Sequence, residues 1–325
     1  MQGFIIKKNE ENQRFDKYLK KLLPNASTSF LYKMMRKKNI CINGNKATGN
    51  EMLKAGDSIK IFFSDETLDK FMGNQENLND EYDKLSRLTM QGITICYEDD
   101  DILIANKPFN MLSQKAAPGD IAANEILLGY LIRKGKLSRD DFRTFRPSVA
   151  NRLDRNTTGL LLMGISLKGS QELGHMLKAR PLGKYYLAVV AGELLKPAKL
   201  HGYLKKNSAN NQVTISAHKE AEDDAYIETE YEPVAWANNT TLLKVHLITG
   251  KTHQIRAHLA SVGHPVICDP KYGDSKINRQ FYEQYHVKGQ LLHAFCLVFP
   301  DGKEYYAPVP AYFGKISATY RIEHL

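Results

Sequence analysis

The chain has 325 residues, of which 42% are hydrophobic, so it is long enough for more than one domain with a buried core. Its formal charge of +9 and its pI near 9.1 favour a polyanionic partner, although a basic protein without such a partner has the same composition. The four cysteines are scattered without a C-x-x-C pair, which argues against a zinc site or a disulfide framework. The sequence shows no signal peptide and no apolar stretch that could span a bilayer, so we expect a soluble, cytoplasmic protein.

Residues 1–63 are the basic part of the chain, with thirteen lysines and arginines against five acids. Helical spacing of apolar residues predicts a helix that stops at Pro24, and a second helix capped by Ser27 or Thr28. Residues 40–45 predict a hairpin turn, and residues 58–63 a strand. The inner stripe of the second helix consists of Leu31, Met34 and Met35, and its basic residues Lys33, Arg36, Lys37 and Lys38 fall outside that stripe. Such lysines and arginines usually form a solvated face.

Residues 64–90 reverse the sign of the charge. Between residues 64 and 87 there are seven acids against three basic residues, and no apolar periodicity is visible. We expect an acidic, flexible linker between two domains.

Residues 91–325 form the second predicted domain. The pattern predicts strands at 93–97, 102–106, 184–190 and 243–249, and polar, strand-like sequence at 201–230. It predicts helices at 122–133, from a Ser166 cap to about residue 178, and at 253–262 with Thr252 as the cap. In the strand at 184–190, period two places Tyr186, Ala188 and Val190 on one face. In the last helix we expect Ile255, Leu259 and Val262 to be buried, with Gln254 and Arg256 beside the core.

Asp154 is the principal candidate for chemistry. It stands between Arg152 and Arg155 in a polar loop that precedes the apolar run at 159–164. From the pattern alone, a structural ion pair is the more common role for such an acid. A core aromatic residue is likewise the ordinary role for Tyr186, and a surface cap or ion pair is as reasonable as catalysis for Arg256.

Other site classes are disfavoured by the sequence. His253 and His258 lie five residues apart on a helix and point in different directions, and no acid completes a ligand set, so we expect no metal site. Neither a phosphate-binding glycine loop nor a G-x-S-x-G motif occurs. A lone aspartate also differs from the two carboxylates of ordinary glycosidases. It fits a nucleophile or base that stays ionised beside an arginine.

The basic N-terminal segment resembles the S4 RNA-binding domain. The resemblance runs from Arg14-Phe15-Asp16 to Ala55-Gly56-Asp57, through two short helices and a hairpin. It implies that the second helix contacts RNA backbone through four residues: Lys33, Arg36, Lys37 and Lys38.

The second domain resembles the RluA-type family of RNA pseudouridine synthases. The segment Arg152-Leu153-Asp154-Arg155-x-Thr157-Thr158-Gly159 is similar to the catalytic signature of that family. Segments at 97–112, 184–192, 249–269, 292–294 and 307–310 agree with further family motifs in order and spacing. Asn151 and Lys251 depart from the pattern, because many members have histidine and arginine at these positions.

The resemblance implies an α+β fold, with a small S4-like module followed by a catalytic domain on a curved, mixed, mostly antiparallel sheet flanked by helices. It implies that Asp154 attacks the ribose or removes a ribose proton from a flipped uridine, and that Arg256 pairs with Asp154. Tyr186 would pack on the base and help remove the C5 proton, and Leu292 and Arg152 would contact the substrate.

The same resemblance implies that no cofactor is needed and that the partner is RNA, in particular large-subunit (23S) ribosomal RNA. We expect a monomer that binds neither membrane nor metal. Two alternatives remain at this point. One is a transfer RNA pseudouridine synthase, and the other is a non-catalytic S4-type RNA-binding or ribosome-assembly protein.

Overall fold

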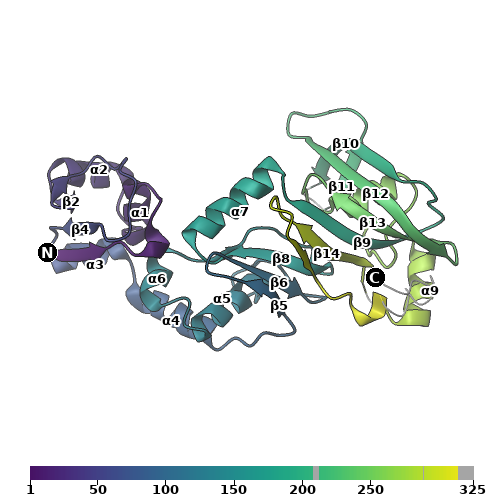
Figure 1. Ribbon diagram of the computed structural model, residues 1–325, viewed down its shortest axis with the longest axis horizontal. Coiled ribbons are helices and arrows are strands. Elements are labelled where there is room, and N and C mark those ends of the chain that lie inside the picture. Colours follow the sequence, from purple (N-terminus) through teal and green to yellow (C-terminus); the bar gives the residue numbers. More distant parts are fainter. Residues whose placement is uncertain (208–211, 288, 314–325) are drawn as a thin grey trace.

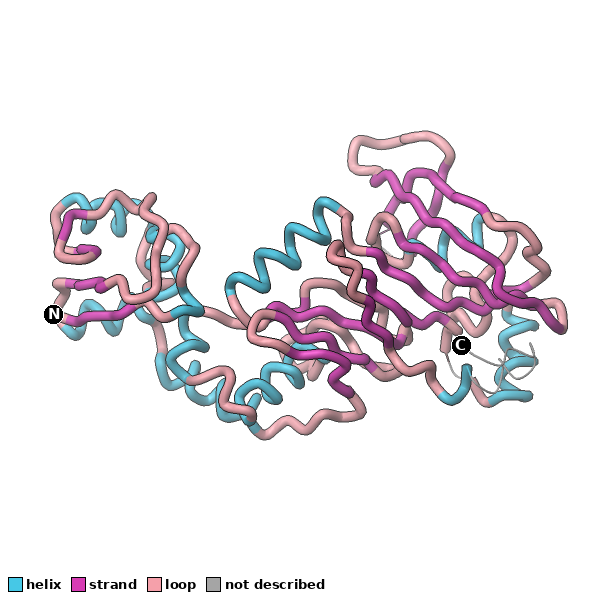
Figure 2. Tube along the Cα trace, in the orientation of Figure 1, coloured by secondary structure: helices cyan, strands magenta, loops and turns pink. Residues whose placement is uncertain are grey.

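The structure is a computed structural model that describes residues 1–207, 212–287 and 289–313. The chain forms a small N-terminal α+β part and a larger part built on one long, twisted sheet (Figure 1). Figure 2 shows that helices and loops join the two parts. The strands of the large sheet all belong to the larger part. The last twelve residues of the predicted second domain, 314–325, and residues 208–211 of its polar region lie outside the described residues.

The N-terminal part is a four-stranded antiparallel sheet with the order β1-β4-β2-β3, beside two helices. Ser27 caps the second helix by accepting from the backbone N–H of Phe30, and the predicted stripe of that helix is buried. The edge strand β1 has no counterpart in the sequence prediction, because it is short and mostly exposed. The elements are β1 (Gln2–Ile5), η1 (Lys8–Glu10), α1 (Phe15–Leu22), α2 (Thr28–Arg36), β2 (Ile40–Ile42), β3 (Asn45–Lys46) and β4 (Ser58–Ile61).

The prediction of a flexible linker at residues 64–90 is wrong about the conformation of this segment. Most of it forms two helices, α3 (Asp65–Met72) and α4 (Gln75–Ser86). The side chains of Ser64 and Asn74 cap them. Leu68 and Met72 of α3 join the hydrophobic core of the N-terminal part. Leu85 of α4 is buried in the core of the second part. Each helix buries only one or two apolar side chains, which is too few to produce a visible period in the sequence.

The second part contains an 11-stranded sheet within the described residues, with the order β11-β10-β12-β13-β9-β14-β8-β6-β5; β15 pairs with β14 and β7 with β8. Its neighbouring strands are antiparallel except for the β8–β14 pair, as the predicted mixed, mostly antiparallel sheet requires. The strands are β5 (Thr94–Glu98), β6 (Ile102–Lys107), β7 (Ser148–Val149), β8 (Thr158–Gly164), β9 (Gly183–Ala191), β10 (Ala198–Asn207), β11 (Gln212–Ser216), β12 (Ala225–Ala237), β13 (Thr240–Leu247), β14 (Leu292–Val298) and β15 (Glu304–Tyr306).

Helices cover both faces of this sheet. On one face, α5 (Ala123–Arg133) and α8 (Gln254–Ser261) share a core with Tyr186 and Val190 of β9. On the other face, α7 (Leu167–Ala179) and α9 (Ser275–Tyr285) pack against separate clusters. The predicted alternation of β9 is confirmed, because Leu187 and Val189 belong to the cluster beside α9. The Ser166 cap of α7 is also confirmed. A short helix, α6 (Arg139–Thr144), follows α5.

The start of α8 differs from its prediction. The helix begins at Gln254, and its N-cap is His253 in a left-handed conformation with φ of 54° and no side-chain cap, so Thr252 does not cap it. Gln254 and Arg256 are buried, whereas Val262 is 41% exposed, so the buried face is rotated from the predicted one. The reason is that both polar side chains have buried partners, which an apolar pattern does not reveal.

The two parts touch through η1, α1, α6 and α7. The buried carboxylate of Glu10 accepts a hydrogen bond from the Thr144 hydroxyl. Lys7 forms an ion pair of 3.0 Å with Asp141. In the described part of the chain, no helix is both long enough and apolar enough to cross a membrane.

Candidate active site

Asp154 lies in the loop between β7 and β8, and the loop is held on both sides of it. Ser113 accepts from the backbone N–H of Leu153 at 2.9 Å and donates to the Leu153 carbonyl at 2.8 Å. The carbonyl of Arg155 accepts from the N–H of Met111 at 3.1 Å. The segment after β6 therefore fixes the backbone on either side of the carboxylate.

Lys107, at the end of β6, adds a buried charge to this support. Its ammonium donates to the carbonyls of Pro108, Met111 and Arg155 at 2.9–3.0 Å, which uses all three of its N–H groups. Burial lowers the pKa of Lys107 to about 7, and the negative charge of Asp154 opposes that shift. Lys107 falls at the end of a predicted strand and within the motif segment at 97–112, but the sequence predicted no role for it, since a lysine before proline carries no mark of burial.

Two residues join the Asp154 loop to β8 and β14. A Cβ at Gly159 would lie 2.1 Å from the carbonyl oxygen of Ala294, so only glycine allows β14 to approach β8 this closely. The amide of Asn151, which departs from the family pattern, accepts from the N–H of Leu162 at 2.8 Å and donates to the carbonyl of Leu160 at 3.2 Å. Its side chain thus supports the loop and has no contact with Asp154.

Arg256 connects Asp154 to a second acid. Its Nη1 donates to Asp154 Oδ2 at 2.7 Å, which is the predicted pair. Its Nε and Nη2 donate to the two carboxylate oxygens of Asp269, each at 2.7 Å. Burial would lower the pKa of Arg256, but the two carboxylates outweigh it, and the net shift is upward. The guanidinium is therefore a permanently charged group held in one orientation.

Asp269 falls within the motif segment at 249–269, but the sequence predicted no role for it. Its side chain is fully buried, and it also accepts from the N–H groups of Lys271 at 2.8 Å and Tyr272 at 3.2 Å. The side chain of Asp154 is 26% exposed, whereas that of Arg256 is 4% exposed. Asp269 thus orients the arginine from the protein interior, and Asp154 is the acid of the two that is reached from solvent.

Tyr186 lies on the same face of the sheet as this cluster. It is 7% exposed and stands opposite Val245 on one side and Ala294 on the other. Burial raises the pKa of its hydroxyl well above the ordinary value, and the nearby charge of Asp154 raises it further. Leu292, opposite Ala188 on the same face, is buried in the same core cluster.

Each of the three histidines of the α8 region has a hydrogen-bond partner on its Nδ1. His253 Nδ1 lies 3.0 Å from the hydroxyl of Tyr272, and His258 Nδ1 lies 3.0 Å from Thr229 Oγ1. His264 Nδ1 lies 2.8 Å from the carbonyl of Ala191. The Tyr272 ring also lies against the Arg256 guanidinium, with 5.3 Å between the guanidinium carbon and the ring centre.

The predicted RNA-contact residues fall into two places, one beside this cluster and one far from it. Arg152 is exposed on the Asp154 loop, but the basic side chains of α2 belong to the N-terminal part of the molecule (Figure 1). All four of them are exposed: Lys33, Arg36, Lys37 and Lys38. The structure therefore brings together Asp154, Tyr186 and Arg256 but leaves the basic helix at a distance.

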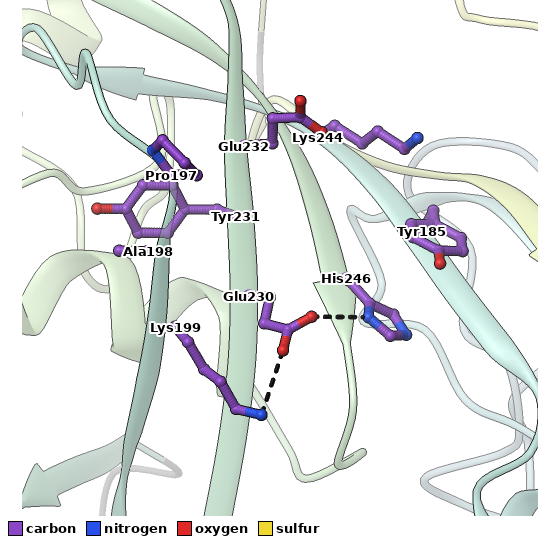
Figure 3. A pocket seen from close by; sticks show the side chains of 9 residues that line it. All are labelled: Tyr185, Pro197, Ala198, Lys199, Glu230, Tyr231, Glu232, Lys244 and His246. Carbon is purple, nitrogen blue, oxygen red and sulfur yellow. Dashed lines mark hydrogen bonds and ion pairs between the residues drawn. The ribbon is translucent and has the colours of Figure 1, made fainter.

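A cavity of about 490 Å³ lies elsewhere on the sheet (Figure 3). Tyr185 lines it and stacks on His246, and Glu230 contacts both His246 and Lys199. Asp154, Tyr186 and Arg256 are not among its lining residues. Because Tyr185 and His246 alternate with Tyr186 and Val245, their side chains point to the opposite face of the sheet.

Comparisons with known proteins agree with this arrangement. Residues 101–261 match the RNA pseudouridylate synthase family, and residues 13–59 match the S4 domain. The chain is 31% identical to a Mycoplasma capricolum protein named an uncharacterized RNA pseudouridine synthase, over 86% of this chain and 88% of that one. The chain therefore belongs to the RNA pseudouridine synthase family, and it carries an S4 domain at its N-terminal end.

Further relatives bear more specific names. The chain is 28% identical to the ribosomal large subunit pseudouridine synthase C of Haemophilus influenzae, over 92% of this chain and 87% of the relative. Among solved structures, human RNA pseudouridylate synthase domain containing 4 has the same fold, with a TM-score of 0.56 and 16% identity. That similarity covers 77% of this chain and 99% of the human one.

Proposed function

We propose that this RNA pseudouridine synthase acts on large-subunit ribosomal RNA and that Asp154 is its nucleophile or base. The arrangement that carries the proposal is the Asp269–Arg256–Asp154 series. A fully buried acid orients a buried arginine, and the arginine presents one N–H to an acid that reaches the surface. Such a fixed arginine holds the carboxylate in place before the substrate arrives.

The reaction exchanges one bond for another within the nucleotide. The bond from N1 of the uracil to C1′ of the ribose breaks, and a bond from C5 to C1′ forms. C5 loses a proton and N1 gains one, so the composition of the RNA is unchanged and no cofactor is required. Asp154 either attacks the ribose or removes a ribose proton, and both routes begin with its ionised carboxylate. The uridine must first leave its stack, which costs a few kcal/mol.

Tyr186 and Leu292 would enclose the flipped base. The raised pKa of Tyr186 means that its hydroxyl is neutral in the resting enzyme. The Tyr186 hydroxyl can accept the C5 proton only if it gives its own proton to another group. The carboxylate of Asp154 is the nearby acceptor for that proton once the carboxylate no longer interacts with the sugar. Tyr186 would therefore act as a packing surface and a proton relay, not as a free phenolate.

Basic residues outside the cluster would hold the rest of the RNA. Lys33, Arg36, Lys37 and Lys38 form one exposed turn at the end of α2, suited to backbone phosphates. Arg152, exposed beside Asp154, would contact the nucleotides around the target. The relatives named as large subunit enzymes support ribosomal RNA over transfer RNA as the substrate, and we propose a cytoplasmic location with it. We propose a monomer with the S4 domain as its second contact with RNA.

The decisive variant is Asp154→Asn, which keeps the shape of the side chain and a hydrogen bond to Arg256. We expect tritium release from 5-tritiated RNA to fall by at least about 10³-fold while RNA binding stays within a few-fold of wild type. Glu230→Gln, an acid on the opposite face of the sheet, is the matched control and should keep full activity. Wild-type rates in Asp154→Asn would refute the mechanism.

The substrate is tested separately, by mapping pseudouridines in cells that lack the protein. Loss of sites in large-subunit ribosomal RNA would support the proposal. Loss confined to transfer RNA would refute the ribosomal assignment but not the mechanism. Wild-type protein that binds RNA and releases no tritium from any RNA fraction would favour the non-catalytic alternative.

A further inference from the structure

Lys184 is a buried lysine for which the mechanism has no use. It lies in β9 two residues before Tyr186, on the same face of the sheet, and is 8% exposed. Within residues 1–207, 212–287 and 289–313, its ammonium has no ion pair and no hydrogen bond. The ammonium is not among the fully buried polar atoms without a partner, so it keeps some contact with solvent while most of the side chain is buried. Burial of most of the side chain removes part of its hydration, which is costly for a charged group.

The other buried lysine near the site shows what a structural role requires. Lys107 places its ammonium among three carbonyl oxygens, so the fold itself replaces its hydration. Lys184 has nothing equivalent. If this position only required an apolar side chain for packing, methionine would fill the same space without the cost of burying a charge. The presence of a lysine therefore points to a partner outside the chain.

The surroundings of Lys184 indicate the charge of that partner. Arg180, at the end of α7, is the charged residue that acts on it most, and it is also a cation. Burial and Arg180 together lower the pKa of Lys184 to about 8, so the ammonium is still mostly protonated at neutral pH. Among the residues that the structure describes, no acid acts on Lys184, and two cations so arranged make a site for an anion.

Gly250 lies next to the ammonium of Lys184. This residue lies in an exposed loop between β13 and α8, and a Cβ added there would lie 3.7 Å from Lys184 Nζ. The glycine does not have a positive φ, so the backbone does not require it. Its missing side chain instead avoids a contact with the ammonium that a larger residue would make.

We propose that Lys184 binds a phosphodiester oxygen of the RNA, at the edge of the active site beside the target uridine. The proposal rests on the proposed function, because it takes Tyr186 as the residue under the base. Two residues along a strand span about 7 Å, which is comparable to the reach from a base to the phosphate of the same nucleotide. A lysine is suited to this task because it binds a phosphate as a compact point charge. The contact would fix the sugar in front of Asp154 after the uridine has left its stack.

The test measures the salt dependence of binding to large-subunit ribosomal RNA prepared from cells that lack the protein. Each lost phosphate contact should reduce the slope of log K against log salt concentration by about 0.7–0.9. We expect this loss in Lys184→Met, with affinity about 10-fold weaker at low salt. Lys244→Met removes one charge from the neighbouring strand on the opposite face and should keep the wild-type slope. Gly250→Leu, which covers the ammonium without removing it, should resemble Lys184→Met.

Thermal unfolding separates binding from a structural role. If the ammonium is unpaired in the free protein, Lys184→Met should melt at or above the wild-type temperature, because an apolar side chain replaces a buried charge. A wild-type slope in Lys184→Met, or a lower melting temperature or failure to fold, would overturn the proposal. Tritium release by wild-type protein is measured on the same RNA. Its absence would count against the proposed function, while the slope would still report on Lys184.

Discussion

The two faces of β9 carry similar chemical groups with very different surroundings. On the Tyr186 face, Arg256 and Asp269 have side chains that are 4% and 0% exposed. On the Tyr185 face, Lys199 and Glu230 form an ion pair of 3.2 Å, with side chains 54% and 40% exposed (Figure 3). Each face has a tyrosine, an acid and a cation, but only the buried set is held in one geometry. Burial, more than residue type, distinguishes the candidate active site.

The strongest test of this contrast is Arg256→Met against Lys199→Met. Removal of Arg256 leaves Asp269 as a buried charge without its main partner, and we expect a loss of about 3–5 kcal/mol in the free energy of unfolding. Tritium release should become undetectable. Lys199→Met should cost less than about 1 kcal/mol, since exposed pairs contribute little. Urea unfolding measures both, and equal losses would contradict the contrast.

The two tyrosines test the same difference by chemistry. Tyr186→Phe removes only the hydroxyl, and we expect kcat to fall by about 10²–10⁴-fold if that hydroxyl relays the C5 proton. Tyr185→Phe should leave kcat within about 2-fold of wild type. Single-turnover tritium release gives both rates. If the two variants are equally active, Tyr186 contributes its ring alone.

The comparison of a buried and an exposed face also predicts how the stability of the protein depends on pH, through its buried histidines. Burial lowers the pKa of His258, near Thr229, from 6.5 to about 4. In the unfolded chain this histidine therefore binds a proton below about pH 6.5, whereas in the folded protein it binds one only below about pH 4. Stability should fall as the pH drops through this window, by up to about 3 kcal/mol for this group.

Denaturant unfolding between pH 4 and pH 7 measures this effect. His258→Asn should give a shallower dependence of stability on pH than wild type. His246→Asn, on the exposed face, should retain the wild-type dependence because His258 is intact. The burial of His293 also lowers its pKa to about 4, so a residual slope in His258→Asn is expected. An unchanged slope in His258→Asn would count against the argument.

The smallest effect is expected for Glu230→Gln. Glu230 contacts Lys199 and His246 on the solvent side of the sheet, and its loss should change the free energy of unfolding by less than about 1 kcal/mol. Activity should be unchanged. A loss of activity here would show that the Tyr185 face takes part in RNA binding.

The sequence was sufficient to bring Asp154, Tyr186 and Arg256 together as candidate site residues. Strand alternation assigned Tyr186 to the correct face, and the motif resemblance joined Asp154 to Arg256 across about a hundred residues. The sequence was not sufficient to predict the buried polar residues that hold these side chains in place. Asp269 reaches Arg256 from a loop after α8, and an acid in a loop reads as exposed. The buried polar face of α8 was missed for the same reason, since periodicity records apolar side chains only.

The groups that support the Asp154 loop could not be recognised from the sequence either. Ser113 and Lys107 act through backbone carbonyl and N–H groups, which any sequence possesses. Helices α3 and α4 were missed because each is attached to a different core by very few apolar contacts. Their caps, Ser64 and Asn74, were the available signals, but a polar residue in an acidic segment is as common in a loop.

The packing of α4 on α5 has a consequence for how the two RNA-binding surfaces cooperate. A Cβ at Gly129 of α5 would lie 2.3 Å from the carbonyl oxygen of Leu85, so the helices meet at backbone distance. The segment between the S4 domain and the catalytic sheet is thus ordered during folding, before RNA is present. A flexible tether would spread the S4 domain over many positions and dilute its effective concentration at the second RNA site. In this protein the orientational entropy of the tether is removed in advance, so an RNA that fits both surfaces gains the second contact at little further entropic cost.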